Sequence, residues 1–471
     1  MAYGSLLRER RRALHARIVE ALEELYPARL TEQVERLAYH ALWGEVWEKA
    51  LTYSRQAGTK AGTRSAYWEA VARFEQALEV LTHLPKSRHT REQAIDLRLD
   101  LRSSLNPLGE IARIHDHLRE AEVLAKALDD QRRLGEISDR QCQNSWRMGD
   151  YGASLAFGQH ALAISMALGD VRLQFNTNLH LASTYHVLGD YHRAVSYLRT
   201  NLVSLEGMLS PRRVGPGGDN SVASRALLSQ CLAELGAFAE EITYGEEGIR
   251  MAEAADHPFS RAIAYGGVGP LYLRQGHLHK AIIMLERGVE LCQVWQIQLL
   301  FPYVASPLGV AYALSGQVAE AVLLLEQAAS MRFIRHLSSS LAALSEAYLL
   351  ACRPDDAMPL AQRAFEVAQQ YNERGNQAWT LRLLGEIAAH RDPPETQQAE
   401  DHYRQALALA EELSMHPLQA HCHLGLGTLY AEMDRQEQAR TELSTAIALY
   451  RTMDMTFWLP QAEATLTQVR G

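Results

Sequence analysis

Closely spaced histidines occur at three places in this chain, and paired histidines are a residue type that can hold a transition metal. The pairs are His115/His117, His277/His279 and His421/His423. On a helix, residues two apart point in different directions, whereas metal sites there use spacings of three or four. No third ligand group accompanies any pair in the sequence. We therefore predict scattered histidines, with neither a metal nor another cofactor.

One glycine-rich string invites comparison with a phosphate-binding loop. Such a loop has the pattern GxxxxGK[ST], in which backbone amides and a lysine hold the phosphates. Residues 58–65 read GTKAGTRS, so the second glycine comes too early and is followed by Thr63 instead of lysine. Neither a nucleophile with its base nor a pair of metal-binding aspartates can be placed elsewhere. The sequence predicts a chain that is not an enzyme.

Charge and cysteine usage restrict the classes of partner and compartment. The 471 residues include 47 Lys and Arg against 56 Asp and Glu, giving a net charge of −9. Because nucleic-acid surfaces normally carry a basic excess, we expect no nucleic-acid partner, and residues 8–12 (RERRR) are interpreted as a solvated helix face. Five separated cysteines without CxxC spacing, and a polar and charged beginning, indicate a reduced protein in a bacterial-type cytoplasm.

Residues 291–319 contain no charged side chain and could be mistaken for a membrane span. The stretch also contains Pro302, Pro307, Gly309 and Gly316, and a span needs about 20 predominantly apolar residues. We interpret it as a buried central repeat that makes the middle of a groove apolar, and we expect no membrane partner.

The elements that must position any site are set by a recurring pattern, clearest in residues 181–198 (LASTYHVLGDYHRAVSYL). Ala182 is followed three residues later by Tyr185, then by Gly189 at a turn and by Ala194. The turn glycines of the copies are Gly149, Gly189, Gly236, Gly276 and Gly316, and later copies have Cys352 and Asp434 there. From Ala281 onward the steps between equivalent alanines are 40, 36, 42 and 40 residues. A fixed period of this length predicts a solenoid.

Each residue type in the pattern has a physical role. Ala321 and Ala328 lie seven apart on one helical face and let helices approach closely, while Leu325 fills the groove between them. Glycine accepts the left-handed conformation that a helix end needs, and the tyrosine before it is expected to be a buried ring. The prediction is an all-α, right-handed solenoid of helix–turn–helix repeats with a period near 40 residues.

The pattern resembles the tetratricopeptide repeat. In one copy the resemblance rests on Gly309, Tyr312, Gly316, Ala321, Leu325 and Ala328. The nominal period of that family is about 34 residues, so steps near forty imply longer helices or longer connections. HEAT and armadillo repeats, with periods of about 40–47 residues, are the structural alternative.

Two parts of the chain are expected. Residues 1–130 are predicted to form helical hairpins that lead into the array, although the pattern is weak over residues 94–128, where Gly109 and Ala121 fit only loosely. Residues 131–471 are predicted to form one continuous superhelix. Within it, residues 210–219 read as a long loop, interpreted as a connector, with an anion site as the alternative.

The beginning of the chain has a more specific resemblance. The strings LLRERRRALHARIVEALEELYP and LAYHALWGEVWEKALTYSRQAGTKA resemble the segment that follows the ATPase module in large bacterial signal-transduction proteins. Those proteins join a class III nucleotide cyclase, a kinase or a DNA-binding domain to a nucleotide-switch ATPase and a carboxy-terminal tetratricopeptide array. The resemblance covers nearly the whole chain. It implies a sensor or scaffold arm without the catalytic residues, which have no counterparts here.

Partner-binding residues follow from the same resemblance, since the first helices of tetratricopeptide repeats line the concave face. The polar and aromatic residues at those positions, off the packing face, are Asn176, His180, Ser183, His186, Gln230, Glu234, Arg274, Tyr303, Glu346, Arg382 and Glu386. We expect a non-catalytic scaffold that holds a partner peptide or helix in this groove. The alternative is an arm that senses a small-molecule inducer and closes around it.

Overall fold

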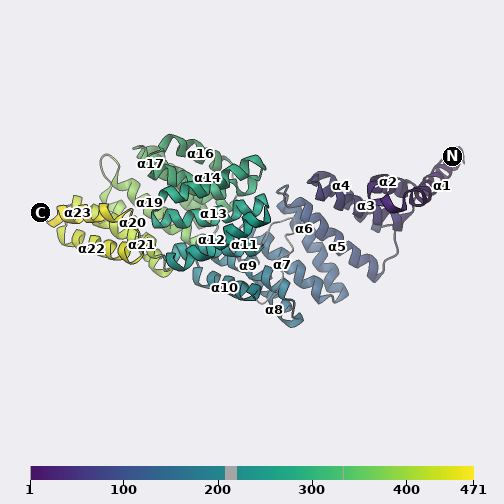
Figure 1. Ribbon diagram of the computed structural model, residues 1–471, viewed down its shortest axis with the longest axis horizontal. Helices are drawn as coiled ribbons and strands as arrows, with labels where there is room; N and C mark the ends of the chain where they lie inside the picture. Colours follow the sequence, from purple (N-terminus) through teal and green to yellow (C-terminus); the bar gives the residue numbers. More distant parts are fainter. Residues whose placement is uncertain (1, 207–219, 332–333, 471) are drawn as a thin grey trace. The chain divides into compact units, whose positions relative to one another are not determined.

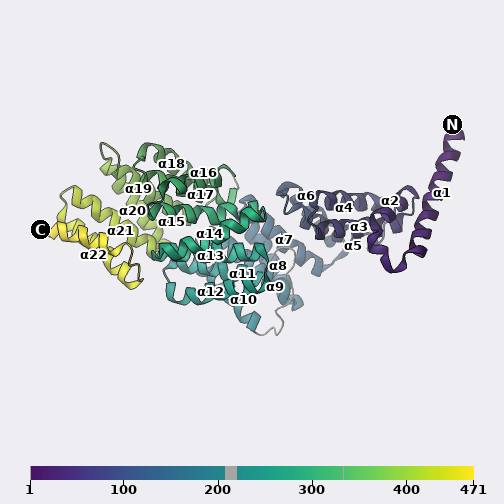
Figure 2. The ribbon, with the colours of Figure 1, turned by 45° about the horizontal axis from the view of Figure 1, so that its top comes forward.

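The computed structural model describes residues 2–206, 220–331 and 334–470, and every regular element in these ranges is a helix. The chain divides into two compact units, the first made of residues 1–145 and 156–174, the second of residues 146–155 and 175–471. Each unit is built from antiparallel helical hairpins (Figures 1 and 2). Within the described ranges no helix is long and apolar enough to cross a membrane. The predicted all-α solenoid is confirmed.

The first unit begins with a long helix and continues as hairpins. Its elements are α1 (Ala2–Leu25), the 3-10 helix η1 (Pro27–Glu32), α2 (Val34–Trp43), α3 (Trp47–Thr63), α4 (Tyr67–Leu81), α5 (Arg88–Leu105) and α6 (Ile111–Leu128). Three helices are each shared between the two units: α7 (Gln131–Met148), α8 (Tyr151–Leu168) and α9 (Val171–Val187). Residue 130, the expected boundary, lies between α6 and α7 inside the first unit, so that division stays a prediction.

Packing in the first unit explains two features that were ambiguous in the sequence. The glycine-rich string begins within α3, where a Cβ on Gly58 would lie 2.7 Å from the ring of Phe74. The string therefore serves the close approach of α4 to α3. The weakly patterned residues 94–128 form the regular hairpin of α5 and α6, with Gly109 at φ +73° in the turn and Ala121 fully buried.

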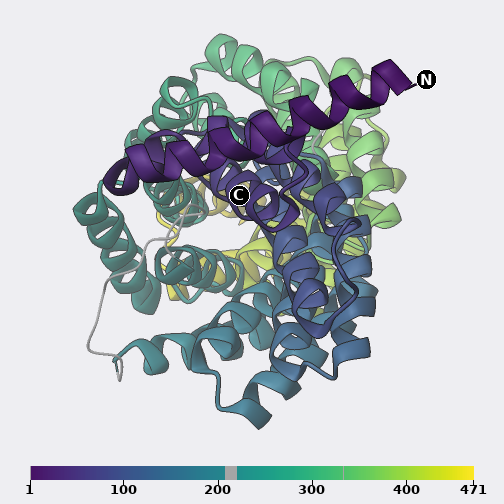
Figure 3. The same cartoon turned by 90° about the vertical axis from the view of Figure 1, so that its right-hand side faces the viewer.

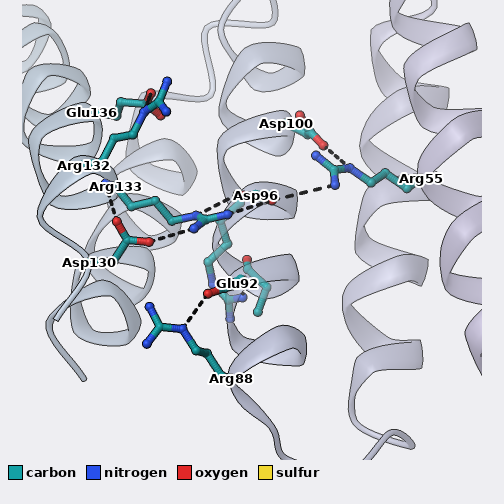
Figure 4. A network of polar contacts seen from close by, with 11 residues as sticks. Arg55, Arg88, Glu92, Asp96, Asp100, Asp130, Arg132, Arg133 and Glu136 are labelled. Atoms are coloured by element: carbon teal, nitrogen blue, oxygen red, sulfur yellow. Dashed lines mark hydrogen bonds and ion pairs between the residues drawn. The ribbon is translucent and has the colours of Figure 1, made fainter. Parts of the chain in front are cut away.

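Ion pairs link α3, α5 and α7 of the first unit (Figure 4). Arg55 on α3 donates to Asp100 on α5 at 2.8 Å. Arg133 on α7 donates to Asp96 on α5 at 3.1 Å and forms an ion pair with Asp130 at 2.7 Å. Arginines and carboxylates therefore neutralise one another along this series of helices.

The second unit continues the hairpins to the end of the described chain. Its further elements are α10 (Tyr191–Glu206), α11 (Asn220–Leu235), α12 (Phe238–Ala255), α13 (Pro258–Gln275), α14 (Leu278–Val294), the 3-10 helix η2 (Gln298–Leu300), α15 (Phe301–Leu314), α16 (Val318–Ser330), α17 (Ile334–Leu350), α18 (Pro354–Gln370), α19 (Arg374–Ala389), α20 (Thr396–Glu412), α21 (His416–Glu432), α22 (Gln436–Thr452) and α23 (Leu459–Arg470). Odd-numbered helices from α11 to α21 are the first helices of successive hairpins and pack against one another. The expected connector, residues 210–219, lies outside the described residues.

The predicted turns have the backbone that the pattern requires. Positive φ angles of 76–88° are found at Gly149, Gly189, Gly236, Gly276 and Gly316. Cys352 and Asp434, which take the glycine's place in later copies, both have φ of 58°. A left-handed residue lets the chain leave the first helix and immediately begin the second.

Helices within a hairpin approach closely where the first helix carries glycine. A Cβ on that glycine would lie 2.3–2.6 Å from a leucine of the second helix in the pairs Gly269/Leu285, Gly309/Leu325 and Gly427/Leu443. Ala321, Leu325 and Ala328 are all at least 98% buried, as the pattern predicts. The tyrosine before the turn is buried in Tyr185, Tyr272 and Tyr430, but Tyr312 and Tyr348 are only half-buried. Their hydroxyls reach outward to Glu286 at 2.7 Å and Glu326 at 2.9 Å on the preceding hairpin.

The uncharged stretch of residues 291–319 contributes the end of α14, η2 and α15. Val304 and Leu308 of α15 are buried, and the helix packs against α13, α14, α16 and α17. The stretch is therefore interior because it is surrounded by other hairpins.

Curvature brings hairpins far apart in the sequence into contact within the second unit, whose teal and green helices bend round in the end-on view (Figure 3). Helix α11 packs against α21. Turn glycines of early hairpins meet side chains of late ones: an added Cβ would lie 2.4 Å from Tyr371 at Gly149, 3.0 Å from Leu413 at Gly189, 2.5 Å from Met453 at Gly236 and 2.4 Å from Phe457 at Gly276. Early hairpins of this unit thus contact hairpins that come several repeats later in the sequence.

Enlarging the small residue at the core of a hairpin should destabilise the second unit. Ala321→Leu adds three carbons at a fully buried position, and we expect the free energy of unfolding to fall by about 1–3 kcal/mol in urea denaturation. The matched control is Ala319→Leu, the same change at an exposed position of α16. Equal stability of the two variants would contradict the packing role of Ala321.

Two turn glycines separate backbone strain from contact between hairpins. Gly149→Ala and Gly316→Ala both place alanine at positive φ, which costs about 1 kcal/mol. Only Gly149 faces a neighbour, Tyr371, whereas nothing lies within 4 Å of a Cβ at Gly316. We therefore expect Gly149→Ala to lower the melting temperature further than Gly316→Ala in scanning calorimetry. Similar losses in both variants would mean that the Tyr371 contact gives way at no cost.

Candidate functional site

The residues expected to line a groove all lie on first helices. Asn176, His180, Ser183 and His186 are on α9, Gln230 and Glu234 on α11, Arg274 on α13, Tyr303 on α15, Glu346 on α17, and Arg382 and Glu386 on α19. The term "inner surface" is used below for one side of α9, α11, α13, α15, α17, α19 and α21. It is the side on which side chains of distant helices meet. Whether a partner binds there stays a prediction, but the structure shows which of these residues come together.

Helices α11 and α19 meet on the inner surface through a shared carboxylate, between residues that are 145 positions apart in the sequence. Glu234 of α11 accepts two hydrogen bonds from Arg274 of α13, both at 3.2 Å. Its other oxygen accepts a hydrogen bond from the indole of Trp379 on α19 at 2.8 Å. The guanidinium of Arg274 lies 3.6 Å from the centre of the Trp379 ring, a cation–π contact. Two of the predicted residues therefore form one network with a tryptophan that sequence reasoning missed.

A second part of this network joins the next first helices. Arg382 of α19 forms ion pairs with Glu346 of α17, at 2.8 Å, and with Glu386 one turn along its own helix. The side chain of Arg382 is 12% exposed, while Glu346 and Glu386 are 25% and 32% exposed. Solvent therefore reaches the carboxylates, and the charge of this arginine is compensated.

Tyr303 lies at a junction of three helices. Its hydroxyl accepts a hydrogen bond from Gln230 of α11 at 3.0 Å, and its ring lies 5.8 Å from that of His336 on α17. Burial raises the pKa of Tyr303 well above its usual value, so the phenol stays protonated. The uncharged stretch that contains Tyr303 does not make its surroundings apolar, because α17 brings His336 and Arg335 beside it.

The α9 residues interact mainly with their own surroundings. Asn176 accepts a hydrogen bond from Asn220 at 2.7 Å, and Ser183 donates to the carbonyl of Leu179 at 2.9 Å. His180 is buried. The ring of His186 meets Tyr191 edge-on at 5.6 Å, and burial lowers its pKa to about 4. The predicted groove residues thus fall into two groups, those on α9 and those that form the networks of the later helices.

Several inner residues escaped prediction because the repeat register does not reveal them. Tyr151 at the start of α8 donates to Glu373 at 3.4 Å, although the two are 222 residues apart. Glu373 directly precedes α19 and also accepts hydrogen bonds from Ser338 and, at 3.0 Å, Asn376. Burial raises the pKa of this carboxyl. The sequence signals that could have found the region are Trp146–Arg147 before the first turn glycine and Arg335–His336 at the start of α17.

The histidine pairs do not converge on a common point. His421 meets Tyr450 at 2.9 Å and Trp458 ring to ring at 4.7 Å, whereas His423 pairs with Glu442 at 2.5 Å. Among the residues that the structure describes, no group of three His, Cys, Asp or Glu is placed to hold a metal ion. Burial also raises the pKa of Cys292 and Cys422 to about 12, so neither thiol ionises near neutral pH.

Three histidines that are largely shielded from water make the stability of the second unit sensitive to acid. Burial lowers the pKa of His186 to about 4 and that of His336 and His421 well below 6.5. Between pH 6.5 and 4 the unfolded chain therefore binds protons that the folded chain does not, and the free energy of unfolding falls as pH decreases. This contribution is complete above pH 6.5.

We expect His186→Gln to remove up to about 2 kcal/mol of the loss in unfolding free energy between pH 7 and pH 5, measured by urea denaturation at both values. The raised pKa of Glu373 opposes the histidine effect in wild type and variant alike, so it cancels in the comparison. His279→Gln, at an exposed position of α14, is the control. A pH dependence unchanged in His186→Gln would exclude a buried neutral imidazole there.

One segment of the chain matches a known repeat family. Residues 395–452, from just before α20 to the end of α22, match the tetratricopeptide repeat family. No match is found among curated proteins.

Solved structures resemble the chain in fold at low sequence identity. A Rap protein complexed with competence and sporulation factor is 12% identical, with a TM-score of 0.58, over 78% of this chain and 99% of that one. The Rap conjugation gene regulator of the plasmid pLS20 with the Phr* peptide is also 12% identical, with a TM-score of 0.50, over 79% and 99%. The human IFIT1 dimer with m7Gppp-AAAA is 14% identical, with a TM-score of 0.48, over 89% of each chain. The likeness to the two Rap structures shows a tetratricopeptide-like helical solenoid, which is a statement about the fold alone.

Proposed function

We propose that the second unit is a non-catalytic scaffold or sensor arm that binds a peptide or helical segment of a partner protein on its inner surface. The observation that carries this proposal is the convergence of polar and aromatic side chains from α11, α13, α15, α17 and α19. They combine amides, carboxylates, guanidinium groups and aromatic rings, with solvent still reaching Glu346 and Glu386. Such a mixture suits a peptide, whose backbone needs both donors and acceptors.

The similar structures support the same class of ligand. Both Rap structures are described as complexes, one with competence and sporulation factor and one with the Phr* peptide. The present chain covers 99% of each of those proteins. We carry over only the class of ligand, a peptide.

The cellular role that we propose rests on the resemblance of the beginning of the chain. The strings near residues 6–27 and 37–61 resemble the segment that follows the ATPase module of bacterial signal-transduction proteins. The chain would then be the recognition arm of such a machine, working in the cytoplasm and without nucleic acid as its ligand. A small-molecule inducer is the other ligand class for this arm, and the experiment below distinguishes the two.

Peptide binding is tested by panning a random dodecapeptide phage library against the full chain and measuring the enriched peptides by fluorescence anisotropy. We expect Gln230→Ala and Asn376→Ala to weaken binding roughly fivefold each, since each removes about one hydrogen bond. Leu323→Ala, an exposed change on α16, should leave the dissociation constant unchanged.

Two results would contradict peptide binding on the inner surface. Enriched peptides that bind both inner variants as tightly as wild type would place the site elsewhere. A failure to enrich any peptide, together with a metabolite that raises the melting temperature of wild type but not of Gln230→Ala, would favour the inducer-sensing arm.

A further inference from the structure

Among the described residues, Arg335 is an inner-surface cation that forms no ion pair. It is the second residue of α17, and its guanidinium lies 4.0 Å from the centre of the Trp146 ring at the end of α7. Tyr303 of α15, Tyr151 of α8 and Glu373 before α19 are close enough to influence its charge. In residues 2–206, 220–331 and 334–470, however, no carboxylate lies within ion-pair distance of Arg335.

The other inner arginines differ in this respect. Arg274 pairs with Glu234, and Arg382 pairs with both Glu346 and Glu386. Glu373 is the carboxylate whose charge affects the pKa of Arg335. Its oxygens already accept hydrogen bonds from Tyr151, Ser338 and Asn376. Arg335 is half-buried, and a charge held partly out of water without a partner is costly, so proteins normally compensate it.

The pKa of Arg335 reflects its removal from bulk water. Burial lowers the pKa of Arg335 to about 10. Burial, followed by the charge of Arg335, lowers the pKa of the neighbouring Arg147 to about 10 as well. Arg335 stays charged at neutral pH, and its charge is felt at the end of α7.

A second polar group at the same place lacks a partner. His336, next to Arg335 in sequence, is 91% buried, and its Nε2 atom makes no hydrogen bond in the structure. Its ring lies against Tyr303, and burial keeps it neutral by lowering its pKa. A buried nitrogen without a partner costs free energy that a bound ligand can recover.

We propose that Arg335, Trp146 and His336 form a subsite for a carboxylate group of the bound ligand. This inference rests on the proposed function and specifies the end of the peptide, or its acidic side chain, that enters the second unit. The flat guanidinium, held against Trp146, presents two parallel N–H donors that match a planar carboxylate, and the Nε2–H of His336 adds a third. A bound carboxylate supplies the negative counter-charge that Arg335 lacks among the described residues.

The first test uses small probes on the full chain: hippurate, which has a free carboxylate, and hippuramide, its neutral amide. At constant ionic strength and tenfold excess over the dissociation constant, hippurate should raise the melting temperature by about 2–4 °C, and hippuramide should not. Arg335→Gln should abolish this rise without lowering the melting temperature of the free protein, because it removes an uncompensated charge. Arg363→Gln, on the exposed face of α18, should behave as wild type.

Three outcomes would overturn the subsite. They are equal shifts with hippurate and hippuramide, a hippurate shift retained by Arg335→Gln, and a melting temperature of free Arg335→Gln several degrees below wild type. The last would mean that Arg335 supports the fold. The carboxylate would also be the wrong ligand class if inorganic phosphate raised the melting temperature and hippurate did not.

The second test separates this subsite from the proposed function. Peptides enriched by panning are compared with a free carboxy terminus, with an amidated terminus, and with Asp and Glu replaced by Asn and Gln. One of these peptide changes should weaken binding to wild type by at least about tenfold and leave binding to Arg335→Gln unaffected. That result would support the subsite and show which carboxylate enters it. Peptides insensitive to all three would overturn the subsite and leave peptide binding intact. A hippurate shift without any peptide ligand would overturn peptide binding and leave the subsite intact.

Discussion

The close approach of two helices at a residue with little or no side chain is the constraint on which the second unit depends. Gly269, Gly309 and Gly427 each face a leucine sixteen residues later, at distances that leave no room for a Cβ. Ala321 and Ala328 continue the same contact on the second helix and are buried. Since protein interiors are packed as densely as organic crystals, a methyl group more or less at these points changes how neighbouring hairpins stack.

Stacking of this kind accumulates into curvature, and curvature determines what can meet. Early turns come to rest on late hairpins, with Gly149 against Tyr371 and Gly276 against Phe457. The turn glycines therefore have two functions, because positive φ ends the first helix and the missing side chain admits the next layer. A consequence is that inner residues more than 140 positions apart share hydrogen bonds, as Glu234 and Trp379 do.

Inside this curved stack, charge is distributed unevenly. Carboxylates neutralise Arg274 and Arg382, and the tyrosines before the turns tie neighbouring hairpins together through glutamates such as Glu286 and Glu326. These contacts hold the solenoid together. Among the described residues, Arg335 has no ion-pair partner and the Nε2 atom of His336 has no hydrogen-bond partner, and for this reason we place the carboxylate subsite there.

Local physics was readable in the sequence. It includes the helix–turn–helix units, the period near forty residues, the positive φ at the turn glycines from Gly149 to Gly316, and the assignment of candidate residues to first helices. Each of these depends on residues close together in the chain. The weak pattern over α5 and α6 was not decisive, because Ala121 is recognisable as a core residue only once the helices around it are packed. The meeting of Trp146 with Arg335, and of Tyr151 with Glu373, was decided by the tertiary structure alone. The reason is physical: small rotations between successive hairpins add up over many repeats, and no local pattern states their sum.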